Sequence, residues 1–132
     1  MDAANSAATY KMQQVMTASP EELTLMLYNG AIRFVTESML ALEARDFEKS
    51  HNTNIKTQKI VREFMATLDM DYEISHNWMQ LYDYIEYCLV QGNLKKDAGK
   101  LKEAKDMLVQ LRDTWYQAMK KAREEKAMMK SS

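Results

Sequence analysis

The stretch TASPEELTLMLY, from Thr17 to Tyr28, contains the clearest helix start in the chain. Ser19 stands directly before Pro20, and Glu22 follows three residues after Ser19. A serine at this position accepts a hydrogen bond from a free N–H of the first turn, proline fits the first helical position, and the glutamate reaches back to the cap. Pro20 is also the only proline, so it predicts a sharp boundary between an N-terminal arm and a helical remainder.

Four long helices are predicted after this boundary, because apolar residues recur at helical spacing and the 132 residues include only three glycines. They span about residues 20–44, 47–68, 73–95 and 97–126, with a cap at Asp97 for the last one. Helices joined by such short connections alternate in direction. The predicted fold is therefore all-α: an antiparallel up-down-up-down four-helix bundle over residues 17–130, preceded by a mobile N-terminal arm over residues 1–16.

Each predicted helix has an apolar stripe that indicates its core face. In chain order, these core stripes are Leu23, Leu27, Ala31, Phe34 and Leu42; Phe47, Val61, Phe64, Met65 and Leu68; Ile74, Trp78, Leu81, Tyr82, Ile85, Leu89 and Gly92; and Leu101, Ala104, Leu108, Leu111, Trp115, Ala118 and Ala122. The near-heptad spacing of the last set is typical of bundle packing.

The first and third helices also carry a second apolar stripe on the opposite side. These outward stripes are Leu25, Tyr28, Ile32 and Met39 in the first helix and Met79, Tyr87, Val90 and Leu94 in the third, while Ile55 lies off the core stripe of the second. A helix that is apolar on two sides is either central in a bundle or covered by a partner. Two explanations stay open: a long amphipathic partner that passes around the bundle, or a homodimer that buries one stripe.

Two further features also allow two explanations each. Gly30 and Gly92 lie inside predicted helices, where glycine costs about 1 kcal/mol relative to alanine. They indicate either close helix crossings or room for a partner helix. The twelve methionines are either ordinary core residues or part of a surface that adapts to varied apolar groups.

The composition limits the classes of function. The net charge is −1 and the lysines of KKDAGKLKEAKD are interleaved with acids, so nothing indicates binding to nucleic acid or to an anionic membrane. The N-terminus lacks the pattern of a signal peptide and no apolar run approaches the ~20 residues of a membrane helix, so we expect no membrane insertion. The single cysteine, Cys88, excludes an internal disulfide and is interpreted as a small core residue of a cytosolic protein.

Two Glu-x-x-His pairs suggest an enzyme as an alternative. Glu48 with His51 and Glu73 with His76 resemble the ligand pairs of a di-iron four-helix bundle. The pairs stand at the starts of helices that run in opposite directions, and helix length alone separates them by ~25 Å, so they cannot share one metal site. Neither histidine is followed by the lysine and glycine of a phosphotransfer bundle. We therefore expect no catalytic residues, no metal and no other cofactor.

Several stretches resemble the flagellar secretion chaperone family, FliS. Gln14-Val15 followed by TASPEELTLMLYNGAIRF resembles the N-terminal signature of that family. The stretches LYDYI (81–85) and LVQGNLKKDAGKL (89–101) are similar to its third helix and third turn, and Asp113, Thr114 and Trp115 are similar to its last helix. The matching stretches follow one another in the same order along nearly the whole chain.

This resemblance implies a cytosolic export chaperone that binds the C-terminal segment of flagellin, prevents its premature polymerisation and delivers it to the gate of the flagellar type III export apparatus. It also implies an arm that occupies part of the flagellin groove and moves aside. With the outward stripes, the predicted flagellin-binding residues are Tyr10, Met12, Val15, Leu25, Tyr28, Ile32, Ile55, Met79, Tyr87, Val90 and Leu94. The alternative is a self-associating helical-bundle interaction or signalling protein without catalytic activity, weakly homodimeric through the same stripes.

Overall fold

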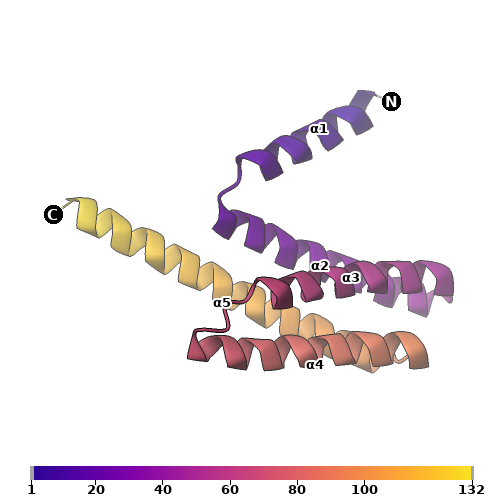
Figure 1. The fold of residues 1–132 in the computed structure, drawn as a ribbon. Coiled ribbons are helices and arrows are strands. Elements are labelled where there is room, and N and C mark those ends of the chain that lie inside the picture. The colour runs from indigo at the N-terminus through magenta and orange to yellow at the C-terminus, as the bar shows by residue number, and fades with distance from the viewer. Residues whose placement is uncertain (1, 132) are drawn as a thin grey trace.

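The computed structural model describes residues 2–131, with side chains from residue 6 onward. Within this range the chain forms five α-helices and no strand (Figure 1). The helices are α1 (Asp2–Thr17), α2 (Pro20–Glu43), α3 (Phe47–Thr67), α4 (Glu73–Lys95) and α5 (Ala98–Ser131). The all-α fold class predicted from the sequence is confirmed.

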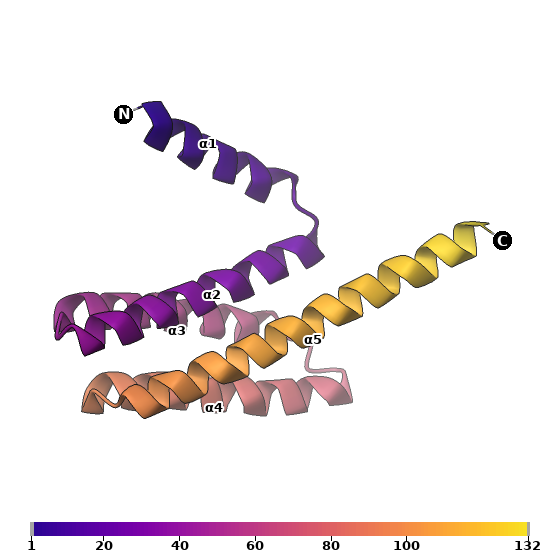
Figure 2. The same ribbon diagram turned by 180° about the vertical axis from the view of Figure 1, so that it is seen from behind.

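The N-terminal arm is itself a helix, α1, which the sequence pattern did not predict. Its first half is rich in alanine, and glycine and proline are absent before Pro20, so the intrinsic helix propensity is high even though no clear apolar stripe exists. Figures 1 and 2 show α1 diverging from the other four helices, which we call the helical body (α2–α5). Because periodicity reports burial rather than propensity, a helix that packs against little is not found by pattern.

The helical body forms a ring of neighbours in which α2 packs against α3 and α5, and α4 packs against the same two helices. All four helices contribute to one apolar core. The α2–α3 and α4–α5 turns lie together at one end, which we call the paired-turn end (residues 44–47 and 96–98). The α1–α2 and α3–α4 connections lie at the other end, the arm end (residues 18–19 and 68–72), beyond which α5 projects (Figure 2).

The predicted helix starts are confirmed by their capping contacts. The Glu22 N–H donates to Ser19 Oγ at 3.2 Å, and the Gly99 N–H donates to Asp97 Oδ1 at 2.9 Å. The Glu22 carboxylate, expected to reach back to its own cap, instead accepts from Arg123 Nη2 of α5 at 3.3 Å. The start of α2 is therefore tied to α5 as well as capped.

Several residues assigned to the core stripes are exposed, so these assignments were wrong. They are Leu27, Phe47, Ile74, Leu81, Ala118 and Ala122. Phe47 and Ile74 lie in the first turn of their helices. At these helix starts the side chains are not covered by another helix and stay exposed. Around Ala118 and Ala122 on α5 the buried side chain is that of Met119, and Ala122 lines a surface hollow with Ser19 and Glu22 at the start of α2. Leu27 and Leu81 lie well inside their helices, and each is next to a buried tyrosine, Tyr28 or Tyr82, so the assigned face was displaced from the buried one.

The contact between α2 and α3 includes a polar seam, which a search for apolar stripes could not find. Ser38 Oγ donates to the Ser50 carbonyl at 2.8 Å, and Ser50 Oγ donates to the Ser38 carbonyl at 2.9 Å. Deeper along α3, Asn54 Nδ2 donates to the Leu89 carbonyl of α4 at 3.1 Å. No buried side-chain nitrogen or oxygen among the described residues lacks a hydrogen-bond partner, so the seam carries little desolvation penalty.

The two helical glycines are predicted to respond oppositely to alanine. A Cβ at Gly92 would lie 2.6 Å from Leu101 Cδ2 and 3.3 Å from the Asp97 carbonyl oxygen, so Gly92 marks a close helix crossing. A Cβ at Gly30 would meet only Ile60 Cδ1, at an ordinary 3.7 Å. We expect Gly92→Ala to lower the free energy of unfolding by about 1–2 kcal/mol and Gly30→Ala to raise it by about 0.5–1 kcal/mol. Urea unfolding followed by circular dichroism measures both, and a loss of stability in Gly30→Ala would contradict this assignment.

Candidate protein-binding surface

Five of the predicted flagellin-binding residues have exposed side chains. They are Tyr10, Met12 and Val15 on α1, and Tyr87 and Leu94 on α4. Burial of an exposed apolar side chain is favourable in free energy. A group of exposed apolar side chains therefore indicates a surface that a partner covers. The structure places the α1 residues and the α4 residues on separate helices without direct packing between them.

Five others are only partly buried along the sides of the helical body. They are Leu25 and Ile32 on α2, Ile55 on α3, and Met79 and Val90 on α4. Ile32 packs against the apolar core. These residues do not converge on one patch, because α2 and α4 each pack between the same two helices and do not lie next to each other.

Tyr28 was wrongly assigned to an outward stripe. Its side chain is 2% exposed, its ring stacks on Phe64 with centroids 4.4 Å apart, and Phe64 stacks in turn on Tyr82 at 5.5 Å. The Tyr28 and Tyr82 hydroxyls share a hydrogen bond of 2.6 Å across the body. Helical spacing placed Tyr28 on the outward stripe, but its hydroxyl is satisfied inside the core by that of Tyr82. The three stacked rings join α2, α3 and α4.

One apolar hollow of about 430 Å³ lies between α1 and α2. Val15 lines it from the arm, and Leu23, Met26, Leu27 and Gly30 line it from the first half of α2. Leu27 was expected in the core, but it is 38% exposed and lies in this hollow. Gly30 also lines this hollow, and a Cβ there would meet Ile60 of α3 at an ordinary distance, so Gly30 does not mark a close helix crossing.

A second hollow of about 430 Å³ opens at the arm end of the body. Its walls include Trp78 from α4 and Trp115 from α5, and its floor is formed by the rings of Tyr28 and Phe64. Ile74 is exposed at its edge. Since both hollows are lined by the first turns of α2, one extended partner could reach both without crossing the body.

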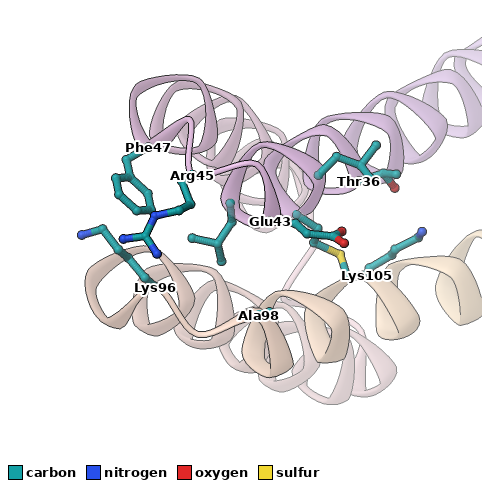
Figure 3. Close-up of a pocket in the computed structure, with 10 residues that line it drawn as sticks. Thr36, Glu43, Arg45, Phe47, Lys96, Ala98 and Lys105 are labelled. Atoms are coloured by element: carbon teal, nitrogen blue, oxygen red, sulfur yellow. The ribbon is translucent and has the colours of Figure 1, made fainter.

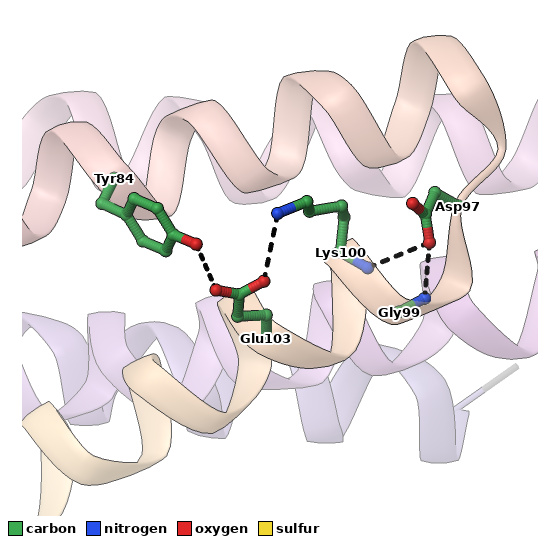
Figure 4. A network of polar contacts seen from close by, with 5 residues as sticks. All are labelled: Tyr84, Asp97, Gly99, Lys100 and Glu103. Atoms are coloured by element: carbon green, nitrogen blue, oxygen red, sulfur yellow. Dashed lines mark hydrogen bonds and ion pairs between the residues drawn. The ribbon is translucent and has the colours of Figure 1, made fainter.

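Polar contacts bind α4 to α5 on the side next to Tyr87. Figure 4 shows the Tyr84 hydroxyl donating to the Glu103 carboxylate, which also pairs with Lys100 at 3.4 Å. The hydrogen bond from Tyr84 lowers the pKa of Glu103, and the same contact raises the pKa of Tyr84. Cys88 beneath them is fully buried, and burial raises the pKa of its thiol. The interpretation of Cys88 as a core residue is confirmed.

The buried tyrosine pair predicts a loss of stability at high pH. Burial raises the pKa of Tyr28 and of Tyr82 above the ordinary 10.0, and the hydrogen bond between the two hydroxyls raises the pKa of Tyr28 further. Above pH 10 the unfolded chain releases these protons while the folded chain keeps them, so folding is disfavoured as pH rises. We expect the free energy of unfolding to fall by about 1.4 kcal/mol per pH unit for each retained proton.

Urea unfolding between pH 8 and pH 11 measures this slope. Exposed lysines titrate in the same range, so the matched control is the double variant Tyr28→Phe, Tyr82→Phe, which keeps the rings and removes both hydroxyls. Its slope should be clearly flatter. Equal slopes in the two proteins would show that the lysines, not the tyrosine pair, set the pH dependence.

The two histidines lie at opposite ends of the body, so they cannot share one metal site. His51 Nδ1 lies 2.9 Å from Asn93 Nδ2, near the carboxyl end of α4, whereas His76 lies in the first turns of α4. Among the described side chains, no group of three His, Cys, Asp or Glu residues is arranged to hold a metal ion. Within residues 2–131, no helix combines the length and the apolar character that a membrane span needs.

A helical body with apolar hollows and exposed apolar side chains is typical of proteins that bind segments of other proteins. The model of the family described as flagellar protein FliS matches residues 3–122, so the chain belongs to the FliS family. It is 38% identical to the flagellar secretion chaperone FliS of Bacillus subtilis over 92% of both chains. It is 34% identical to the protein of the same name from Salmonella typhimurium over 82% of both chains. The resemblance drawn from the sequence motifs is confirmed, and these relatives are chaperones rather than enzymes.

Proposed function

We propose that this chain binds the C-terminal segment of flagellin in the cytosol, keeps that segment from polymerising, and delivers it to the gate of the flagellar export apparatus. The membership in a family of flagellar secretion chaperones supports this role. The observation that carries it is the pair of apolar hollows, of about 430 Å³ each, which share the first turns of α2.

The proposal treats the helical body as an antiparallel up-down-up-down four-helix bundle. In such a bundle α2 and α4 occupy opposite corners, and their packing against the same two neighbours supports this arrangement. A partner that contacts the hollows beside α2 and also Tyr87 and Leu94 on α4 must then wrap around the body. A segment that is disordered alone and folds on binding can do so.

Such wrapping also suits release. A segment that becomes ordered on binding loses conformational entropy, which offsets part of the favourable burial and leaves an affinity that the export apparatus can overcome. The arm residues Tyr10, Met12 and Val15 are proposed to contact the flagellin segment or to compete with it for the hollow beside α2. Both roles require the exposed position that α1 has here.

Calorimetric titration of a flagellin C-terminal segment into the full chain tests the proposal. We expect saturable binding at one segment per chain with a negative heat-capacity change, because apolar surface is buried. Tyr87→Ala should weaken binding, whereas Tyr116→Ala should not. These tyrosines form a matched pair, since they are 52% and 49% exposed and Tyr116 lies outside both hollows. Absence of heat together with a molecular size that rises with concentration would favour the self-associating alternative.

A further inference from the structure

The paired-turn end of the body carries a groove that the proposed function does not use. It has a volume of about 600 Å³ and lies between the last turns of α2 and the first turns of α5 (Figure 3). Its apolar lining comes from Met39, Leu40, Leu42 and Phe47. Leu40 and Phe47 are exposed, although neither belongs to a predicted binding stripe. The two hollows proposed for flagellin lie toward the opposite end, although Leu94, also proposed to contact flagellin, is two residues from Lys96.

Three cations surround this apolar lining. Arg45, Lys96 and Lys105 all line the groove, and Glu43 is its only carboxylate. None of the three cations forms an ion pair with any acidic side chain in the part of the chain that the structure describes. With three positive charges and one negative charge in its lining, the groove has an excess of positive charge that attracts an anionic partner.

Two of the three cations, Arg45 and Lys96, lie close to the ring of Phe47. The Arg45 guanidinium carbon lies 5.7 Å from the ring centroid of Phe47, and Lys96 Nζ lies 5.0 Å from it. Figure 3 shows the Arg45 and Lys96 side chains gathered beside this ring. Phe47 thus presents an apolar surface between two positive charges, which suits an amphipathic chain that carries carboxylates beside its apolar side chains.

The backbone at these two cations is unusual in a way that supports a role for their side chains. Arg45 and Lys96 are the non-glycine residues with positive φ in the described chain, at 62° and 52°. Both follow helix ends, where glycine is the common residue because it adopts this left-handed conformation without strain. Stability alone would therefore favour glycine at both positions. Instead the chain has side chains there, both of which line one groove and lie beside the Phe47 ring (Figure 3).

We propose that this basic groove is a second docking site, which takes an acidic amphipathic helical segment of a protein partner. Residues 36 to 45 of α2 and its turn extend for roughly 13 Å, which accommodates two to three turns of such a helix. Its apolar face contacts Leu40 and Phe47, and its carboxylates pair with Arg45, Lys96 and Lys105. The aliphatic lining from Met39, Leu40 and Leu42 favours a protein segment over nucleic acid, whose binding rests mainly on phosphate contacts. This inference does not depend on the proposed binding of flagellin.

Designed helical peptides test the groove with the full chain. One peptide of fifteen residues carries leucines along one face and glutamates beside them, and its control has glutamine at each glutamate position. Fluorescence anisotropy should show the glutamate peptide binding about tenfold tighter than the control, with the difference shrinking as salt rises. Equal affinities of the two peptides would overturn the proposal, as would preferential binding to single-stranded RNA or to anionic vesicles.

Variants of the cations separate binding from folding. The double variant Arg45→Gly, Lys96→Gly should lose most of the binding to the glutamate peptide while its melting temperature does not fall, since glycine suits both backbone positions. The control is Lys59→Gln, which removes an exposed lysine from the interior of α3, where glycine would itself lower stability. This variant should bind the glutamate peptide normally. Unchanged binding in the double variant would overturn the proposal. Undiminished binding of the glutamate peptide in the presence of saturating flagellin segment would show that the two sites are separate.

Discussion

Replacing Phe64 with alanine should lower the free energy of unfolding by about 3–5 kcal/mol, the largest stability change that we expect from a single substitution in this protein. The ring is 5% exposed and lies between Tyr28 and Tyr82, with centroid distances of 4.4 Å and 5.5 Å. Its removal loses the transfer free energy of the ring and both aromatic contacts, which add about 0.5–1.5 kcal/mol per pair beyond burial. A domain of this size has a total stability of about 5–15 kcal/mol, so the variant should be close to unfolding.

Phe47→Ala is the matched control, because it removes the same ring from a position that is 40% exposed. It should cost less than about 1 kcal/mol, within the usual range for surface substitutions and the loss of an exposed cation–π contact. Urea unfolding midpoints with unchanged slopes measure both variants. If the two substitutions cost the same, the stacked rings would not be the contact that joins α2, α3 and α4.

The helix boundaries were predictable because their signals are local. Ser19 with Pro20 and Asp97 before Ala98 each combine a capping side chain with a residue that favours a helix start, and no distant contact is needed to detect them. The α1 helix was missed for the opposite reason. Its helical state comes from propensity, whereas an apolar stripe occurs only in a helix that packs against a neighbour.

The faces of the helices were less predictable, because spacing identifies a stripe but not which neighbour covers it. On α2 the residues Leu27 and Tyr28 are adjacent in sequence, and the pattern placed the leucine inside and the tyrosine outside. The structure has the reverse, since Tyr28 finds a hydroxyl partner in Tyr82 and Leu27 lies where α3 and α5 do not reach. A choice of this kind depends on residues 54 positions apart in the chain.

The exposure of the predicted binding residues is confirmed for some of them. The predicted residues that are exposed lie on α1 and α4, and Tyr10 and Leu94 are among them. The two hollows were not found, because each combines side chains from at least two helices and their shape depends on how α1 and α5 diverge from the body. First-turn positions such as Ile74 would have been a usable signal, since the first turn of a helix is often left uncovered by its neighbours.

Replacing Leu27 with glutamate should weaken the binding of the flagellin segment by about thirtyfold or more, which corresponds to the loss of at least about 2 kcal/mol expected at a central apolar contact. Leu27 lines the hollow between α1 and α2, and a carboxylate there would be covered by the apolar segment without a partner. Because the leucine is already 38% exposed, the fold itself should lose little stability. Calorimetric titration measures the change.

Leu40→Glu provides the control on the same helix. Leu40 is 60% exposed and lines the basic groove at the other end of the body. This variant should bind the flagellin segment normally, and Leu27→Glu should bind the acidic probe peptide normally. If both variants weakened both ligands, the two surfaces would form one site or the substitutions would act through the fold.

The arm decides how the hollow beside α2 works, and Val15→Glu distinguishes its two roles. Val15 faces Leu23 and Leu27 across the hollow. If α1 closes over the bound segment, a charge at Val15 should weaken binding by about tenfold, and Val15→Glu should add little to Leu27→Glu because both disturb one contact region. If α1 instead competes for the hollow, the same charge should release the arm and strengthen binding. Tyr10→Ala, which alters the arm outside the hollow, should then change affinity in the same direction as Val15→Glu, because either substitution would loosen the competing arm.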